Sequence, residues 1–283
     1  MSAVHPGYAP PSSPDHPPSQ PWARRWLIAV TAAWAVLLAG LAWWSARTDE
    51  PTVREQRTIE QAAPVVDAAV GQLVAALDGA AWAMTPSHTE QGCRVTPVST
   101  GAEVTRGIDV LVVEGGERDL LSRVADALPR RWRAGVRDAA EGPRLRADAG
   151  EFVLVEGEST SPGRVRFAVL TGCRPTDSAS GDLLPGNPPE PALRAALQAL
   201  GRPVPEHVDR IWTSCPGGAK AWTERVAAGP EPASLSALAP LAAAGTVVVD
   251  TPEVYAHRSG SDLIVADATG DQLHVMLSSG CAE

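Results

Sequence analysis

The longest continuous apolar stretch of the chain lies near its N-terminus. Residues 26–44 read WLIAVTAAWAVLLAGLAWW and contain no charged side chain. A helix of this length spans about 28–30 Å, which is close to the thickness of the hydrocarbon core of a bilayer. Arg24 and Arg25 precede the stretch, and tryptophans stand at both of its ends, where indole rings favour the membrane interface. The pattern predicts one transmembrane helix over residues 26–45.

The segments on either side of this helix lack an apolar period. Residues 1–25 are rich in proline and serine and predict a disordered cytoplasmic tail, whereas the polar residues 46–58 predict a stalk. The small residues of Ala39-Gly40-Leu41-Ala42 also fit a signal peptidase site, with cleavage after Ala42 as the alternative. The length of the apolar stretch and of the preceding tail favours an uncleaved anchor.

Two later stretches alternate apolar and polar residues and end in Gly-Cys. One runs from Gly150 to Cys173 and the other from Gly260 to Cys281. Each contains an apolar segment, a turn rich in Gly, Pro, Ser or Asp, and a second alternating segment. This period of two residues predicts a β-hairpin with one buried face in each stretch. The inward-facing residues of the second strands are Val165, Phe167 and Val169 in one hairpin and Leu273, Val275 and Leu277 in the other.

Helical periods precede and follow the first cysteine of each pair. Apolar residues recur at helical spacing over residues 65–77 and 120–132, and again over residues 191–200 and 235–241. Pro64 marks the start of the first helix or a kink in it. The order helix, strand, helix, hairpin therefore occurs twice.

We interpret this order as an internal repeat. It predicts an α+β fold with two related units, over residues 59–174 and 191–283, each with a mainly antiparallel sheet covered by helices. The Pro- and Gly-rich residues 175–190 would be the linker between them. Coincidence between two α+β domains is the alternative.

All four cysteines lie after the apolar stretch. They show neither a Cys-x-x-Cys motif nor the Cys/His spacing of a zinc finger. An even number of cysteines in one region is typical of disulfides in an oxidising compartment. If the two units are equivalent, the pairs are Cys93–Cys173 and Cys215–Cys281. The arginines on the two sides of the helix do not decide its orientation, but the cysteines favour an N-terminus inside and a C-terminal domain outside the cytoplasm.

Composition narrows the class of protein further. The 283 residues are 44% hydrophobic and 20% charged, values typical of a folded chain, and the formal net charge is -9. A protein with a net negative charge is repelled by a phosphate backbone, so nucleic acid is not an expected partner. Arginine, alanine, glycine and proline are abundant and Lys220 is the only lysine. This bias indicates a GC-rich bacterial genome and therefore a bacterial cell membrane.

A search for catalytic and metal-binding spacings finds none that fits. The sequence contains no GxSxG, SxxK, HExxH, Walker or GxGxxG motif. His88 with Glu90 lacks a third ligand, and the segment from Asp267 to Asp271 fits a turn better than a calcium loop. We therefore predict no catalytic residue, cofactor or metal site.

One cluster of cations stands out in the acidic body. Guanidinium groups bind carboxylate or phosphate with two parallel hydrogen bonds and stack on indole rings, so the cluster is a candidate anion-binding patch. The alternative is a helix end whose cations pair with nearby carboxylates. The cluster consists of Arg130, Arg131, Trp132, Arg133, Arg137, Arg144 and Arg146.

These observations favour a non-enzymatic, single-pass membrane protein with an extracytoplasmic binding or scaffolding module. Its partner would be the membrane itself and an anionic envelope polymer or another protein. The alternative is a cell-envelope hydrolase or transferase whose residues converge only in three dimensions.

Overall fold

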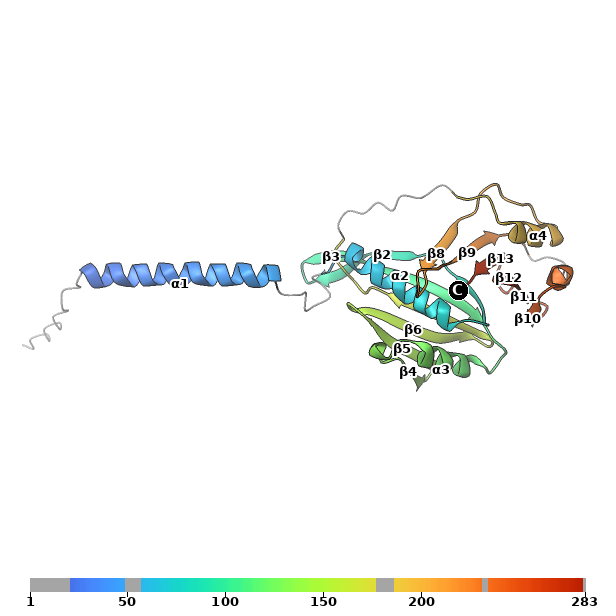
Figure 1. Ribbon diagram of the computed structural model, residues 1–283, viewed down its shortest axis with the longest axis horizontal. Helices are drawn as coiled ribbons and strands as arrows, with labels where there is room; N and C mark the ends of the chain where they lie inside the picture. The colour runs from blue at the N-terminus through green and yellow to red at the C-terminus, as the bar shows by residue number, and fades with distance from the viewer. Residues whose placement is uncertain (1–20, 49–56, 177–185, 231–233, 282–283) are drawn as a thin grey trace, which may run out of the picture. The chain divides into compact units, whose positions relative to one another are not determined.

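The computed structural model describes residues 21–48, 57–176, 186–230 and 234–281 (Figure 1). The chain forms two compact units, Met1–Pro51 and Thr52–Glu283, and the second is called the body below. The predicted tail lies almost entirely outside the described residues, as do most of the stalk and the middle of the linker.

The first unit contains a single long helix, α1 (Pro21–Thr48). Its segment Arg25–Trp44 has a mean hydropathy of 2.0 and is long and apolar enough to cross a membrane. The segment agrees with the predicted span over residues 26–45. Its length and composition near the N-terminus fit a single span or a signal anchor.

The first sheet of the body has seven strands, all paired antiparallel. The strand order is β1-β3-β7-β6-β5-β4. The strand β1 pairs with residues 108–111 of the long strand β3, and β2 pairs with residues 99–105. Its elements are α2 (Ile59–Ala76), β1 (Ala81–Met84), β2 (His88–Thr96), β3 (Ser99–Leu111), α3 (Glu117–Ala127), the 3-10 helix η2 (Arg130–Trp132), β4 (Gly135–Ala139), β5 (Gly142–Gly150), β6 (Val153–Ser161) and β7 (Arg164–Leu170).

The second sheet has six antiparallel strands in the order β10-β11-β12-β13-β9-β8. Its elements are α4 (Pro191–Ala199), β8 (Arg210–Ser214), β9 (Lys220–Ala227), the 3-10 helix η3 (Leu235–Ala242), β10 (Thr246–Asp250), β11 (Val254–Ser259), β12 (Asp262–Asp267) and β13 (His274–Ser279).

The two sheets follow the same strand order when they are read in chain order. Without β1, the first sheet runs β2-β3-β7-β6-β5-β4, and the second runs β8-β9-β13-β12-β11-β10. A helix precedes each set, and helical segments separate its second strand from its third. The prediction of one strand and one strand pair per unit was therefore incomplete. Among the missed strands, β4 and β10 lie at sheet edges, whereas β5 and β11 lie inside the strand order.

Helix α2 begins earlier than the sequence pattern indicated. Thr58 is its N-cap and accepts a hydrogen bond from the Gln61 amide, while the Gln61 side chain accepts one from the Thr58 amide. This capping box satisfies two amides that the first turn leaves unpaired. Pro64 lies inside the helix, so the first turn forms before it.

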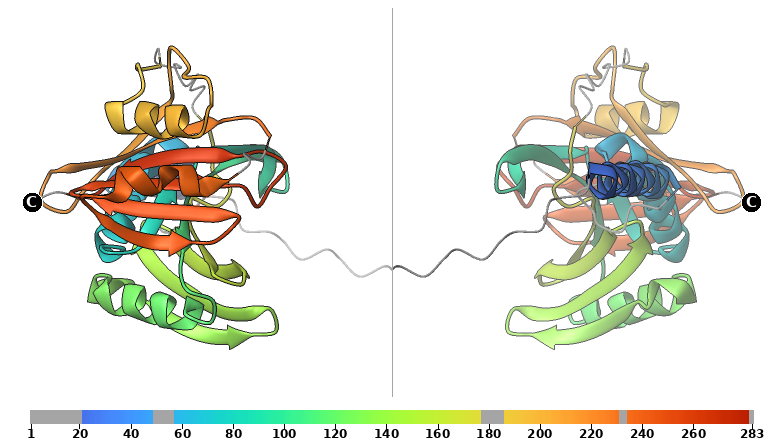
Figure 2. Two further views of the ribbon diagram at one scale, coloured as in Figure 1. Left: turned by 90° about the vertical axis from the view of Figure 1, so that its right-hand side faces the viewer. Right: turned by 90° about the vertical axis from the view of Figure 1, so that its left-hand side faces the viewer.

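The two sheets differ in how their faces are covered. The apolar residues of α2 and α3 pack on one face of the first sheet, and α4 and η3 pack on one face of the second (Figures 1 and 2). The other face of the second sheet packs on β1 and α2. Both Val275 and Met276 of β13 are consequently buried, and the expectation of a single buried face was wrong for this strand.

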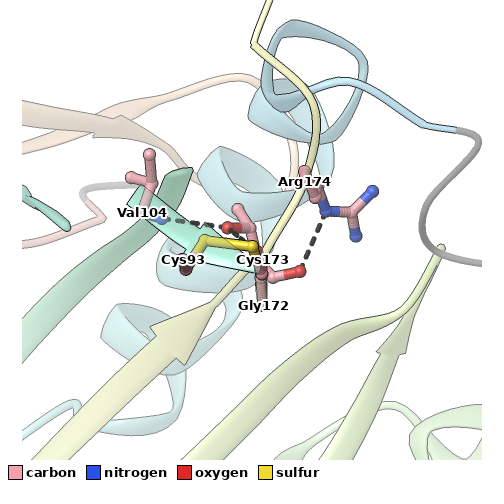
Figure 3. The surroundings of a disulfide bond; sticks show 6 residues. Cys93, Val104, Gly172, Cys173 and Arg174 are labelled. Carbon is pink, nitrogen blue, oxygen red and sulfur yellow. Dashed lines mark hydrogen bonds between the residues drawn. A yellow bond between two sulfur atoms is a disulfide. The ribbon is translucent and has the colours of Figure 1, made fainter. Parts of the chain in front are cut away.

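Two disulfides close the body, in the pairing predicted on the assumption of two equivalent units. Cys93 of β2 is bonded to Cys173 after β7, and Cys215 after β8 is bonded to Cys281 after β13. Figure 3 shows the first bridge beside the buried Arg174, whose Nε donates to the Thr171 carbonyl over 2.9 Å. The first bridge thus links β2 to the end of β7, and the second links the end of β8 to the end of β13.

Candidate functional site

A groove of about 940 Å³ lies where the two sheets meet. Its walls come from the segment after β3 (residues 111–114), the β6–β7 turn (160–164) and the β10–β11 region (248–254). A second hollow of about 480 Å³ shares five lining residues with it. We call the two together the inter-sheet groove; the shared residues are Leu111, Val112, Val113, Val248 and Val249.

An ion pair joins the two sheets at this groove. Arg164 of β7 donates to both carboxylate oxygens of Asp267 of β12, over 2.7 and 2.9 Å. Burial raises the pKa of Asp267, but hydrogen bonds from Arg164 and Thr269 outweigh burial and hold the pKa below its ordinary value. The carboxylate therefore stays charged and acts as a fixed link rather than as a proton acceptor.

The β6–β7 turn is also held in place by hydrogen bonds within the first sheet's half of the body. The Gly163 amide donates to Glu117 over 2.5 Å, and the Gly163 carbonyl accepts from the Val112 amide over 3.0 Å. The hydrogen bond from Gly163 is the main reason that the pKa of Glu117 lies below its ordinary value. Gly163 has φ of +75°, which side chains rarely adopt. One wall of the groove is thus fixed by backbone contacts.

Charge in the groove is unevenly distributed. Two of its three arginines are neutralised, since Arg164 binds Asp267 and the Arg166 Nε donates to Asp109 over 2.7 Å, whereas Arg123 has no ion pair with a described residue. The hydrogen bond to Asp109 raises the pKa of Arg166. The groove carboxylates form no ion pair with any residue that the structure describes, which leaves a negative surplus. They are Asp78, Glu114, Asp119, Asp250 and Glu253.

A further hollow of about 450 Å³ lies between α2 and β8. It contains a cluster of hydrogen bonds centred on Asp67, which we call the clasp. Asp67 of α2 accepts hydrogen bonds from Arg106 (2.9 Å), Thr213 (3.0 Å) and the Ser214 amide (3.2 Å). Burial raises the pKa of Asp67, but these donors lower it below its ordinary value. A carboxylate stabilised in this way is a weak base, so the clasp serves to hold α2 on β8.

Arg210, which also borders this hollow, forms ion pairs with two carboxylates. It donates to Glu224 over 2.7 Å and to Glu190 over 2.6 Å. Burial lowers the pKa of Arg210, but these carboxylates raise it above its ordinary value. Its guanidinium also lies 4.6 Å from the centre of the Trp222 ring. Arg210 therefore contributes no free charge to the hollow.

The predicted anion-binding patch is divided among different environments. Trp132 is 3% exposed and packs in the core, so its indole offers no open face for stacking. Arg144 pairs with Glu141 and with Glu158 (3.3 Å), and Arg146 pairs with Glu156 (2.6 Å). Arg133 lies 3.9 Å from Asp148. The exposed members without an ion pair to any described residue are Arg130, Arg131 and Arg137.

Sequence reasoning offered Glu141 and Asp148 as partners but missed Glu156 and Glu158, because these two come from the neighbouring strand β6. Glu158 lies opposite Arg144 and also opposite Arg166, which itself lies opposite Asp109. The outer face of the first sheet thus carries a row of alternating charges across four strands. Cross-strand pairs of this kind stabilise a solvated sheet face, and the register that creates them cannot be read along the chain.

The histidines of the described residues do not gather into a reactive cluster. His257 is buried on β11 and His274 is partly buried on β13, and burial lowers the pKa of both. His88 is exposed on β2. Among the described residues, no three His, Cys, Asp or Glu side chains are grouped as metal ligands.

Comparison of the chain with protein-family models, curated proteins and solved structures gives no match.

Proposed function

We propose that the protein is a membrane-anchored extracytoplasmic binding module whose binding surface is the inter-sheet groove. The observation that carries this proposal is the construction of the groove. Its walls come from both sheets, the Arg164–Asp267 pair joins them, and unpaired carboxylates border apolar residues. Binding sites commonly combine a concave, largely pre-formed surface with a few well-placed polar groups.

Two features support the proposed location. Disulfides persist in oxidising compartments and are rare in the cytoplasm, and the body contains two of them. The segment Arg25–Trp44 is suited to span the membrane and to hold the body at its surface. The proposed arrangement has the N-terminus in the cytoplasm of a bacterial cell and the body outside.

External protease on right-side-out membrane vesicles tests the location. We expect digestion of the body and protection of a short N-terminal fragment. Alkylation of the denatured protein before and after reduction should show thiols only after reduction. A body that resists external protease until the vesicles are opened, with four free thiols, would place it in the cytoplasm and overturn the proposal.

Site-specific photo-crosslinking in the same membranes tests the binding surface. A photoreactive residue at Thr251, in the groove, should give discrete adducts. The same residue at Ala139, on the exposed edge strand β4, is the matched control and should give none. Equal labelling at both positions would contradict a role for the groove.

We also infer that the two halves of the body are related units. The shared strand order, the matching positions of the helical segments and one disulfide at the same place in each sheet support this inference. Superposition of residues 88–170 and 210–279 from an experimental structure tests it. Matched strands should align over the whole unit, and a difference in the handedness of the helical connections would contradict common descent.

The arginines remain a second candidate surface, for an anionic envelope component. Arg130, Arg131 and Arg137 are exposed and unpaired among the described residues, and free guanidinium groups bind phosphate and carboxylate well. Replacement of Arg130, Arg131 and Arg137 by Ala should then reduce binding to envelope extracts. Full binding by this triple variant would exclude the surface.

A further inference from the structure

The outermost strand of the second sheet, β10, has an open edge. It pairs with β11 on one side only, and no backbone hydrogen bond links its other side to a described residue. Its sequence is TVVVD, and Val247 is 46% exposed. An exposed edge of β-branched residues presents unpaired amides and carbonyls to which another chain can add.

The opposite edge of the same sheet is closed. Helix α2 lies against β8, and the Ser214 amide donates to Asp67 of that helix. The approach is so close that a Cβ on Gly71 would lie 1.9 Å from the Ser214 carbonyl oxygen. The second sheet therefore has one edge, β8, covered by α2, and one open edge, β10.

The uncovered edge forms a wall of the inter-sheet groove. Val248 and Val249 of β10 line it together with residues 111–113, in which Val113 is 81% exposed. An extended segment laid along β10 would place alternate side chains near these valines while its backbone pairs with the strand. The register shift between Val247 and Val249 interrupts the regular edge, so the added ladder would be short.

Charge identifies the kind of segment that fits. Arg164 and Arg166 are neutralised by Asp267 and Asp109, whereas Arg123 has no ion pair with a described residue. Five groove carboxylates likewise have no ion pair with a described residue, so a negative surplus remains; they are Asp78, Glu114, Asp119, Asp250 and Glu253. A strand with lysine or arginine beside apolar residues would complement both the negative rim and the apolar wall.

We propose that the inter-sheet groove takes an extended cationic segment of a partner protein, which adds to β10 as a further antiparallel or parallel strand. The inference rests on the proposed function, because it names the class of partner for the same groove.

Binding of short synthetic peptides to the purified full chain in detergent tests this proposal. The probe alternates lysine and valine. One control replaces lysine by glutamate, and another carries N-methyl groups on alternate amides, which removes backbone donors without changing charge. We expect saturable binding of the probe and at least about tenfold weaker binding of each control. Equal binding of the methylated peptide would overturn strand addition, and equal binding of the glutamate peptide would overturn charge selection.

Variants locate the site. The double substitution D250K/E253K should weaken binding of the probe at least about tenfold, because it reverses the charge of the rim. The matched control E90K changes an exposed carboxylate on β2 and should leave binding unchanged. Equal weakening by both variants would place the peptide elsewhere.

Two other results would overturn the proposal. One is absence of probe binding by a folded chain. The other is a dimer in sedimentation experiments that D250K/E253K leaves intact and that Val247→Pro dissolves, because a second copy would then occupy the edge. Groove-specific crosslinks in membranes together with no peptide binding would overturn this inference alone and leave the proposed function standing.

Discussion

The strands β4 and β10 occupy the same end of the strand order in their respective sheets, yet their edges differ. β4 reads GVRDA, and its charged residues are exposed; Asp138 pairs with Arg118 of α3. β10 reads TVVVD and exposes valine. Charged residues on an edge disfavour pairing with other chains, and a row of valines favours it. The shared architecture therefore does not determine edge protection, which depends on the side chains of each strand.

The outer faces of the two sheets differ in a related way. The first sheet turns its row of arginines and carboxylates to solvent, as in the pair Arg166–Asp109. The second sheet buries the corresponding face against β1 and α2. Among the described residues of the second half, no strand corresponds to β1. The additional strand β1 thus gives the second sheet a layer on which to pack. The two sheets meet there, and β10 lines the groove between them.

The largest effect on the closed side of the second sheet should come from its disulfide. Replacement of Cys215 and Cys281 by Ala opens a loop that the bridge closes across a sequence separation of 66 residues. We expect the free energy of unfolding to fall by about 4 kcal/mol in the chain-entropy model. Urea unfolding monitored by tryptophan fluorescence measures it. The Cys93/Cys173 double variant, with a separation of 80 residues, is the matched case, and an unchanged midpoint in either would contradict the prediction.

The closed edge itself can be opened with one methyl group. In Gly71→Ala the new Cβ meets the Ser214 carbonyl at 1.9 Å, so α2 must move away from β8. We expect a loss of about 1–3 kcal/mol from overpacking, although alanine favours a helix by about 1 kcal/mol. Gln72→Ala, one residue further along the same helix, is the control and should change little. Stabilisation by Gly71→Ala would show that the edge is loosely packed.

The clasp at the closed edge should make the free energy of unfolding depend on pH in the acid range. Asp67 has a lowered pKa in the folded state, so its contribution is complete above its unfolded pKa of about 3.9 and is lost as pH falls through the folded value. Asp67→Asn leaves Arg106 without its carboxylate partner, although Arg106 still donates to the Trp212 carbonyl, and we expect a loss of about 2 kcal/mol at neutral pH. Below about pH 4 the difference between variant and parent should shrink. A constant difference from neutral to acid pH would contradict the assignment.

Features with a local signal in the sequence were predictable. The apolar run over residues 26–44 indicated α1, and the matching Gly-Cys endings indicated both disulfide pairs. Both signals are local, since a helix long enough to span a bilayer or a strand ending in Gly-Cys appears within one window of sequence.

Features that depend on contacts between distant strands were not predictable. Arg164 and Asp267, which join the two sheets at the groove, are 103 residues apart. The arginine cluster was inferred from proximity in sequence, but strand register gives Arg146 its partner Glu156, and the fold turns Trp132 into the core. A short run of valines such as β10 fits a buried strand as well as an edge, so only the strand order shows that its side is open.

Exchange of the edge residues tests the comparison between β4 and β10 with the smallest effect on stability. Val247→Lys places a charge on the open edge, and Arg137→Val removes one from the protected edge. Because both side chains are exposed, we expect each to change the free energy of unfolding by less than about 0.5 kcal/mol. Self-association should nevertheless diverge, since an added lysine blocks pairing and an added valine permits it. Light scattering at rising protein concentration should show less association than the parent for Val247→Lys and more for Arg137→Val. Identical scattering by both variants would mean that backbone geometry, rather than these side chains, protects the edges.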